Sequence, residues 1–255
     1  MPSAIKHDHE LSKSGLVSIL VEVQGANENE LAAFLWKTFP GNDCFACTST
    51  FVPNPEAPGI PNACVIGVDG TLLWSGNPLS DTKKIDELIA AELVKVKKGW
   101  GASAGARKVR ASLYGKRDLA AALAAVEELP EGDERTQLQK EVDARFASAK
   151  KSIENLKSQG YFLKAEEQSK ELARSVGQRA PWVTEVQPMV AEFDGEALKA
   201  EVALDKKLDK IQDQLRGKKG DGAPKALAAL LKNEGSSKVL DRARALLLAL
   251  QTKVE

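Results

Sequence analysis

The 255-residue sequence lacks several features that would place it in a particular class of protein. Lys and Arg together number 36, and so do Asp and Glu, so neither charge is in excess. This balance argues against the basic surface on which binding to nucleic acid or to an anionic membrane depends. No apolar run reaches the roughly 18 residues that a membrane span requires. The sequence therefore predicts no nucleic-acid partner and no membrane span.

Motifs for several enzyme classes are missing as well. No glycine-rich phosphate loop, dinucleotide fingerprint or nucleophile elbow occurs. The two histidines are His7 and His9, which makes a Ser-His-Asp site implausible. On a helix they would point apart, whereas in an extended segment both could face Cys44 and Cys47 around zinc. We expect solvated histidines, no metal site and no cofactor. The first residues also contain no apolar signal region.

The distribution of proline divides the chain. Of 11 prolines, seven lie in the first 78 residues, which also contain β-branched runs. Aromatic residues are only 5% of the chain, and the part after residue 100 is rich in Ala, Lys and Glu with helical spacing. A stretch rich in Gly, Ala and Ser, 99–105, separates the two compositions. We predict a first domain at 1–98, a linker at 99–105 and a helical domain at 106–255.

Two parts of the first domain predict strands. Residues 16–23 form a near-continuous apolar run, which is typical of a strand buried on both faces. Residues 63–68 and 71–75 are apolar runs on either side of Asp69-Gly70. This pattern predicts a hairpin with a tight primed turn, because such turns need positive φ angles.

Helix signals surround these strands. Gly15 is expected to end a first helix, and Asn27 with Glu30 three positions later is expected to begin a second. Asp81 is the predicted cap of a helix that runs to about residue 98. Residues 40–61 hold five prolines and are expected to form a long loop.

The segment Gly59-Ile60-Pro61-Asn62-Ala63, followed by the hairpin pattern, resembles the second half of a thioredoxin-like domain. It is most similar to the bacterial redoxin branch related to peroxiredoxins and periplasmic thiol reductases, over roughly residues 1–97. The resemblance implies an α/β thioredoxin-like fold for residues 1–98. It also implies a cis peptide bond at Pro61, a groove at Ile60 and Pro61 that presents backbone to a thiol or peptide, and an extracytoplasmic location.

In this family the reactive Cys-x-x-Cys lies where the first strand meets the first helix, whose N-terminus lowers the thiol pKa. Met1-Pro2 resembles a position just after that pair, so the resemblance implies that the first strand and the active cysteines would precede Met1. Weak or absent thiol–disulfide oxidoreductase activity is therefore expected. Three explanations stay open: missing upstream residues, a truncated relative in which segments 16–23 and 63–68 pair directly, or a misleading resemblance.

Cys44 and Cys47 have the Cys-x-x-Cys spacing and are the candidate catalytic pair. They follow a helix and Pro40-Gly41, however, and the residues after them cannot form the helix that would activate a thiolate. A structural disulfide or two inert thiols are the alternatives. Cys64 lies in an apolar strand and is expected to be a small buried residue.

The second domain is predicted to be helical throughout. Helices are expected at 106–128, 134–158, 161–176, 181–215, 223–233 and 236–252. Their pairing resembles tetratricopeptide-type hairpins, but no clean 34-residue period is present, so we predict a degenerate helical-hairpin array. It serves either as a surface for a protein partner or as a bundle that stabilises the first domain.

Two functions therefore compete. One is a protein related to thiol–disulfide oxidoreductases, which acts on a thiol or disulfide substrate. The other is a non-catalytic scaffold that holds a protein partner with the thioredoxin-like groove and the helical array.

Overall fold

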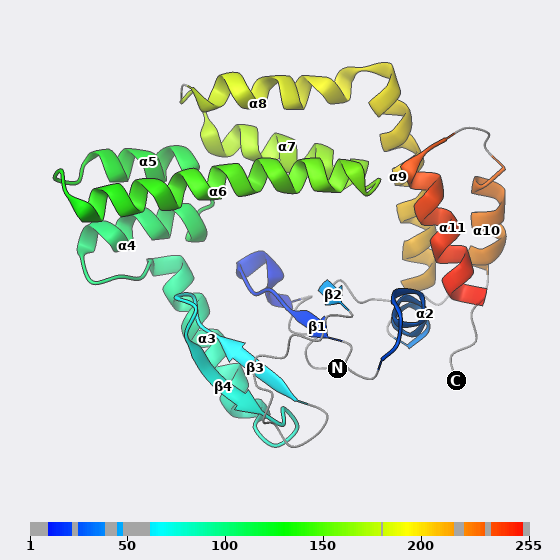
Figure 1. Cartoon of the computed structure of the whole chain (residues 1–255), viewed down its shortest axis with the longest axis horizontal. Helices are drawn as coiled ribbons and strands as arrows, with labels where there is room; N and C mark the ends of the chain where they lie inside the picture. Colours follow the sequence, from blue (N-terminus) through cyan, green and yellow to red (C-terminus); the bar gives the residue numbers. More distant parts are fainter. Residues whose placement is uncertain are drawn as a thin grey trace. The chain divides into compact units, whose positions relative to one another are not determined.

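The computed structural model describes residues 10–21, 25–38, 45–47, 62–179, 181–216, 222–232 and 236–251, and most of these are helical (Figure 1). The chain groups into two compact units. Unit 1 comprises Met1–Gly25 and Asp43–Gln139, and unit 2 comprises Ala26–Asn42 and Lys140–Glu255. Each unit is thus built from two separate pieces of the chain, and segment 99–105 lies inside unit 1.

The described strands form two separate two-stranded sheets. They are β1 (Ile19–Val21), β2 (Phe45–Cys47), β3 (Ala63–Ile66) and β4 (Leu72–Gly76). β1 pairs with β2 in parallel, and β3 pairs with β4 antiparallel. Within the described part of the chain, no strand pairing joins one sheet to the other.

The predicted α/β thioredoxin-like fold for residues 1–98, joined to a helical domain, is therefore wrong. That fold needs one continuous sheet, whereas the described residues are mostly helical and their strand pairings are short. Segment 16–23 was expected to be a strand buried on both faces. Among its described residues, 16–21, the strand covers Ile19–Val21, and Ile19 is 62% exposed. A three-residue strand makes too few ladder hydrogen bonds to organise a layered domain. Within the described residues, segment 16–23 pairs through β1 with β2 and not with segment 63–68.

β3 and β4 form the predicted hairpin, but with a different turn. Gly70 is the turn residue with a positive φ, 84°. Its N–H donates to the Gly67 carbonyl at 3.0 Å, and the Gly67 N–H donates to the Thr71 carbonyl at 2.8 Å. One left-handed residue at the end of the turn is typical of a three-residue loop, not of a primed turn. The carboxylate of Asp69 accepts the Thr71 N–H, and this hydrogen bond lowers the pKa of Asp69.

Helix α3 (Thr82–Lys98) is tied to this hairpin by a buried carboxylate. Glu92 is 8% exposed and accepts the backbone N–H of Val68 at 2.9 Å. Lys95 donates to Glu92, and this hydrogen bond raises the pKa of Lys95. Asp81 precedes the helix as predicted, but its carboxylate accepts the Trp74 indole N–H at 3.3 Å and does not cap a helical N–H. Both carboxylates therefore hold the hairpin against α3.

Segment 99–105, predicted to be a linker, is fixed by two arginines. Arg107 donates to two carbonyl oxygens of the segment, at 3.0 and 2.9 Å. Arg110 donates to the Trp100 carbonyl at 3.1 Å, and its guanidinium carbon lies 5.4 Å from the centre of the Trp100 ring. The segment is therefore a fixed joint between α3 and the helix that follows.

The helices after this joint lie close to their predicted positions. They are α4 (Ala104–Arg110), the π-helical turn η2 (Ala111–Gly115), α5 (Leu119–Glu127), α6 (Asp133–Ser158), α7 (Phe162–Val176), α8 (Trp182–Ala191), the 3-10 turn η3 (Glu192–Asp194), α9 (Glu196–Arg216), α10 (Ala223–Leu230) and α11 (Lys238–Gln251). Asp118 caps α5 by accepting the Ala121 N–H at 2.8 Å. The single helix predicted at 106–128 is divided into α4 and α5, with the π-helical turn η2 following α4.

Gly99 is expected to be essential for the joint between α3 and α4. Its φ is 76°, and a Cβ added there would lie 1.9 Å from the Arg107 carbonyl oxygen. Gly70 is a matched control, since its φ is 84° but no atom lies within 4 Å of an added Cβ. We expect Gly70→Ala to lower the free energy of unfolding by about 1–2 kcal/mol. Gly99→Ala should lower it by roughly 1–3 kcal/mol more. Urea unfolding followed by circular dichroism measures the free energy of unfolding of both variants. Equal losses of stability would contradict the close approach of Gly99 to the Arg107 carbonyl.

Candidate functional site

The thiol site predicted from the sequence lies largely outside the described residues. This holds for Cys44, Ile60 and Pro61, and also for His7 and His9. Cys47 is the last residue of β2, where its backbone aligns with Val21 of β1. Among the residues that the structure describes, no three His, Cys, Asp or Glu side chains could hold a metal ion. The catalytic pair Cys44 and Cys47 and the binding pair Ile60 and Pro61 therefore stay predictions.

Cys64 is the cysteine whose side chain the structure places. It is a half-buried free thiol in β3, opposite Ser75 of β4. Burial raises the pKa of the Cys64 thiol. Because the thiolate is the reactive form, a raised pKa makes the thiol a poorer nucleophile at neutral pH. This setting fits packing in the hairpin and not catalysis.

Side-chain contacts in unit 2 recur at a nearly constant separation in sequence. Lys150 pairs with Glu185 and Lys157 pairs with Glu192, both across 35 residues. Further along, Glu201 accepts the Ser237 hydroxyl across 36 residues, and Asp205 binds Arg242 across 37 residues. The first two contacts join α6 to the α8–η3 segment and the last two join α9 to α11, so the separation is nearly constant within each pair because its helices run in parallel register. We refer to helices α6 to α11 of unit 2 as the helical array.

The first junction of the array joins α6 to α8. The later lysine of α6 pairs with the later glutamate, so α6 and α8 run in the same direction. Figure 1 shows α6, α7 and α8 lying next to one another. Phe146 stacks on Trp182 with ring centroids 4.9 Å apart. Burial would lower the pKa of Lys157, but its hydrogen bonds to Glu192 and Glu154 raise it. Aromatic stacking thus secures this junction, and the ion pairs set its register.

The second junction is held by a buried ion pair. Asp205 on α9 is 3% exposed and accepts the Leu163 N–H of α7 at 2.8 Å. Arg242 on α11 donates to Asp205 and to the Gly160 carbonyl, both at 2.7 Å. Its guanidinium carbon also lies 3.6 Å from the centre of the Tyr161 ring. These contacts bring the α6–α7 turn, α9 and α11 together.

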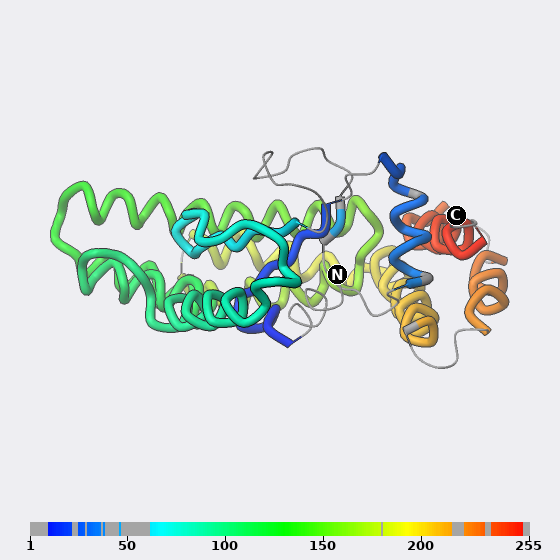
Figure 2. Tube along the Cα trace, turned by 90° about the horizontal axis from the view of Figure 1, so that it is seen from below, coloured from blue at the N-terminus to red at the C-terminus, as the bar shows by residue number. Residues whose placement is uncertain are grey.

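A helix from the other end of the chain covers the last hairpin. α2 (Glu28–Thr38) packs against α11, as the blue and red segments in Figure 2 show. Ala33 of α2 and Ala243 of α11 are both fully buried. The predicted cap of α2 is confirmed, because the Asn27 N–H donates to Glu30 and the Glu30 N–H donates to Asn27, at 2.8 and 3.1 Å. An end repeat needs such a cover over its apolar side.

Comparisons with known proteins assign no family to this chain. No family model, curated protein or solved structure matches it. In the described part of the chain, no helix has both the length and the apolar character to cross a membrane. The contacts of the chain itself therefore carry the functional interpretation, and the array in unit 2 is the candidate site.

The buried Asp205–Arg242 pair yields a prediction with a matched control on the same helix. Arg242→Ala is expected to lower the free energy of unfolding by about 3–5 kcal/mol, because it leaves the Asp205 charge buried without its partner. Arg244 forms an exposed pair with Asp241, with side chains 53% and 59% exposed. Arg244→Ala should therefore change stability by only about 0–1 kcal/mol. Urea unfolding measures both variants, and equal effects would show that the buried pair does not hold the array.

The thiol of Cys64 should react slowly. In a Cys44→Ser, Cys47→Ser variant, Cys64 is the remaining thiol, and its raised pKa predicts less thiolate at neutral pH than in the unfolded chain. We expect slow labelling by Ellman's reagent at pH 7. The rate should rise with pH to a midpoint above the ordinary thiol pKa of about 8.5. The same variant unfolded in urea is the reference, and equally fast labelling of the folded chain would contradict this assignment.

Proposed function

We propose that this protein is a non-catalytic scaffold that holds a protein partner on the face formed by α6 and α8. The recurrence of equivalent contacts in unit 2, at separations of 35 to 37 residues, carries the proposal. Stacked hairpins present extended surfaces that single helices cannot, and such surfaces commonly bind polypeptides. The capping of the stack by α2 supports the same interpretation, because it completes the array without a further hairpin.

The chemistry of this face favours a polypeptide over a nucleic acid. Lys150 and Lys157, which lie on it, are each paired with a glutamate. Binding to nucleic acid depends on lysines that neutralise phosphate groups, whereas the charges of these two lysines are already balanced by glutamates. Ala147, one turn before Lys150, is small and exposed, so a partner side chain can approach the helix there. The face therefore suits a partner with mixed charge.

Thiol–disulfide chemistry stays a prediction for Cys44 and Cys47, and nothing in the described residues favours it. Burial raises the pKa of the half-buried Cys64 thiol, which disfavours the reactive thiolate. The scaffold proposal therefore expects no catalysis of disulfide reduction.

The test compares two variants in each of which one exposed alanine is replaced by glutamate. Ala147 and Ala200 are both exposed, on α6 and α9 respectively, so a glutamate at either position should leave the fold intact. We expect the wild-type chain and Ala200→Glu to retain the same proteins from an extract of the source cells. Ala147→Glu should lose at least one of them, which is then purified for measurement of its dissociation constant. Quantitative mass spectrometry gives the capture result.

A parallel assay separates the scaffold from the enzyme. The wild-type chain is expected to leave the rate of insulin disulfide reduction by dithiothreitol unchanged, and the Cys44→Ser and Cys47→Ser variants should capture the same proteins as wild type. Catalysis that both cysteine variants abolish would support the oxidoreductase instead. If Ala147→Glu and Ala200→Glu capture the same proteins in the same amounts, the partner does not bind on the face formed by α6 and α8.

A further inference from the structure

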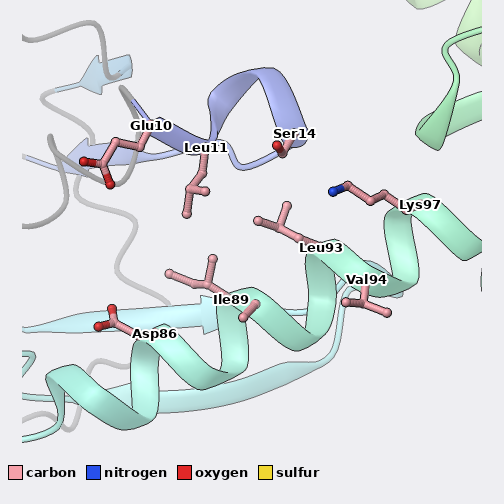
Figure 3. A pocket seen from close by; sticks show the side chains of 9 residues that line it. Glu10, Leu11, Ser14, Asp86, Ile89, Leu93, Val94 and Lys97 are labelled. Carbon is pink, nitrogen blue, oxygen red and sulfur yellow. The ribbon is translucent and has the colours of Figure 1, made fainter.

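The described residues of unit 1 leave an open groove along one side of α3. Its volume is about 360 Å³, and Figure 3 shows Leu11, Ile89 and Leu93 facing one another across it. This volume lies within the range of about 300–1,000 Å³ that is typical of binding clefts. The groove does not involve the helical array, and it would keep its role even if the array bound nothing.

The wall opposite α3 is held in place. It is formed by Glu10, Leu11 and the short 3-10 helix η1 (Ser12–Ser14), which ends at Gly15 with a φ of 110°. A Cβ on Gly15 would lie 3.5 Å from Val96 of α3, so the turn is close to the helix. The Arg117 guanidinium also donates to the Lys13 carbonyl at 3.4 Å. The groove therefore has two defined walls.

The α3 side of the groove follows the period of a helix. Its lining positions are 86, 89, 90, 93, 94 and 97, which is the spacing of residues that share one face. Val94, one turn from the Lys97 end of this stripe, is 48% exposed. A stripe three turns long with an apolar centre is the surface against which a second helix packs. A small polar ligand would instead need convergent polar groups in the floor of the groove.

Charge differs between the two ends of the groove. Figure 3 shows Glu10 and Asp86 at one end and Lys97 at the other. Eleven residues separate positions 86 and 97, a length of about 16 Å along a helix. The complement is an apolar segment of about three turns that is basic at one end and acidic at the other. A helix with acidic residues in its first turn and basic residues in its last has this distribution, which its own dipole also favours.

From these features we propose that the groove binds an amphipathic helix of a partner protein, antiparallel to α3. The acidic first turn of that helix lies at Lys97, and its basic last turn lies at Glu10 and Asp86. Its apolar residues, spaced i, i+3, i+4 and i+7, fill the space between Leu11 and Leu93. The opposite charges at the two ends of the groove fix the direction, and the apolar contacts supply most of the affinity.

The probes are three fluorescent model helices with the same leucine face. One has Glu in its first turn and Lys in its last, one has Lys at both ends, and one has Glu at both ends. We expect saturable anisotropy changes with the full chain. The helix with mixed ends should bind about two- to fivefold more tightly than either of the others, as expected for one exposed ion pair. In Lys97→Glu, where both ends of the groove are acidic, the preference should shift to the helix with Lys at both ends.

A second pair of variants tests the apolar contacts. Val94→Asp should weaken binding more than tenfold, while Ala91→Asp, an exposed position on α3 outside the groove, should change it less than twofold. Circular dichroism verifies that both variants are folded. Three results would overturn the proposal: no saturable binding, equal effects of Val94→Asp and Ala91→Asp, or self-association in sedimentation that Val94→Asp abolishes. The last would mean that a second copy of the chain occupies the groove.

Discussion

The helical array depends on one buried ion pair, between Asp205 and Arg242. Two charges removed from water are unfavourable unless every polar atom finds a partner. Asp205 meets this condition with the Leu163 N–H and the arginine, and Arg242 meets it with the Gly160 carbonyl and the Tyr161 ring. These partners come from three parts of the array, so a shift of any one of them would leave a buried charge unpaired. We interpret the pair as the contact that fixes the register of the hairpins.

Unit 1 uses a related arrangement around Glu92. Its carboxylate accepts the backbone N–H of Val68 across 24 residues, much as Asp205 accepts that of Leu163 across 42. In both units a carboxylate on a helix binds the backbone of a distant turn. Apolar packing is not directional, whereas a hydrogen bond from a buried carboxylate is, so it selects one arrangement of the turn against the helix. The hairpin and the array are therefore positioned by the same physical means.

Local signals in the sequence predicted the helices well, because caps and periodicity act within a few residues. The cap formed by Asn27 with Glu30 is an example. The thioredoxin-like fold failed because it depends on pairing between distant strands, and β1 is only three residues long. The degenerate helical-hairpin array stays a prediction. The described helices of unit 2 are joined by contacts between unlike residues, such as Lys with Glu, and such contacts leave no repeated residue pattern in the sequence. The sequence predicted the helix that follows Asp81, but not that the described residues leave a groove along one side of it.

The equal numbers of acidic and basic residues in the sequence are matched by ion pairs between helices in the structure. Lysines on the array are paired with glutamates across helices, as at Lys150–Glu185 and Lys157–Glu192. Such exposed pairs contribute little stability each, but together they leave a face without a strong net field. A partner that binds there is selected by its shape and by charged groups that replace one member of such an ion pair. Its affinity should therefore depend only moderately on salt concentration. Catalysis needs the opposite arrangement, in which perturbed groups converge on one point. In the described residues the buried carboxylates of Glu92 and Asp205 instead accept hydrogen bonds from backbone N–H groups, Lys95 and Arg242, an arrangement that supports the scaffold we propose.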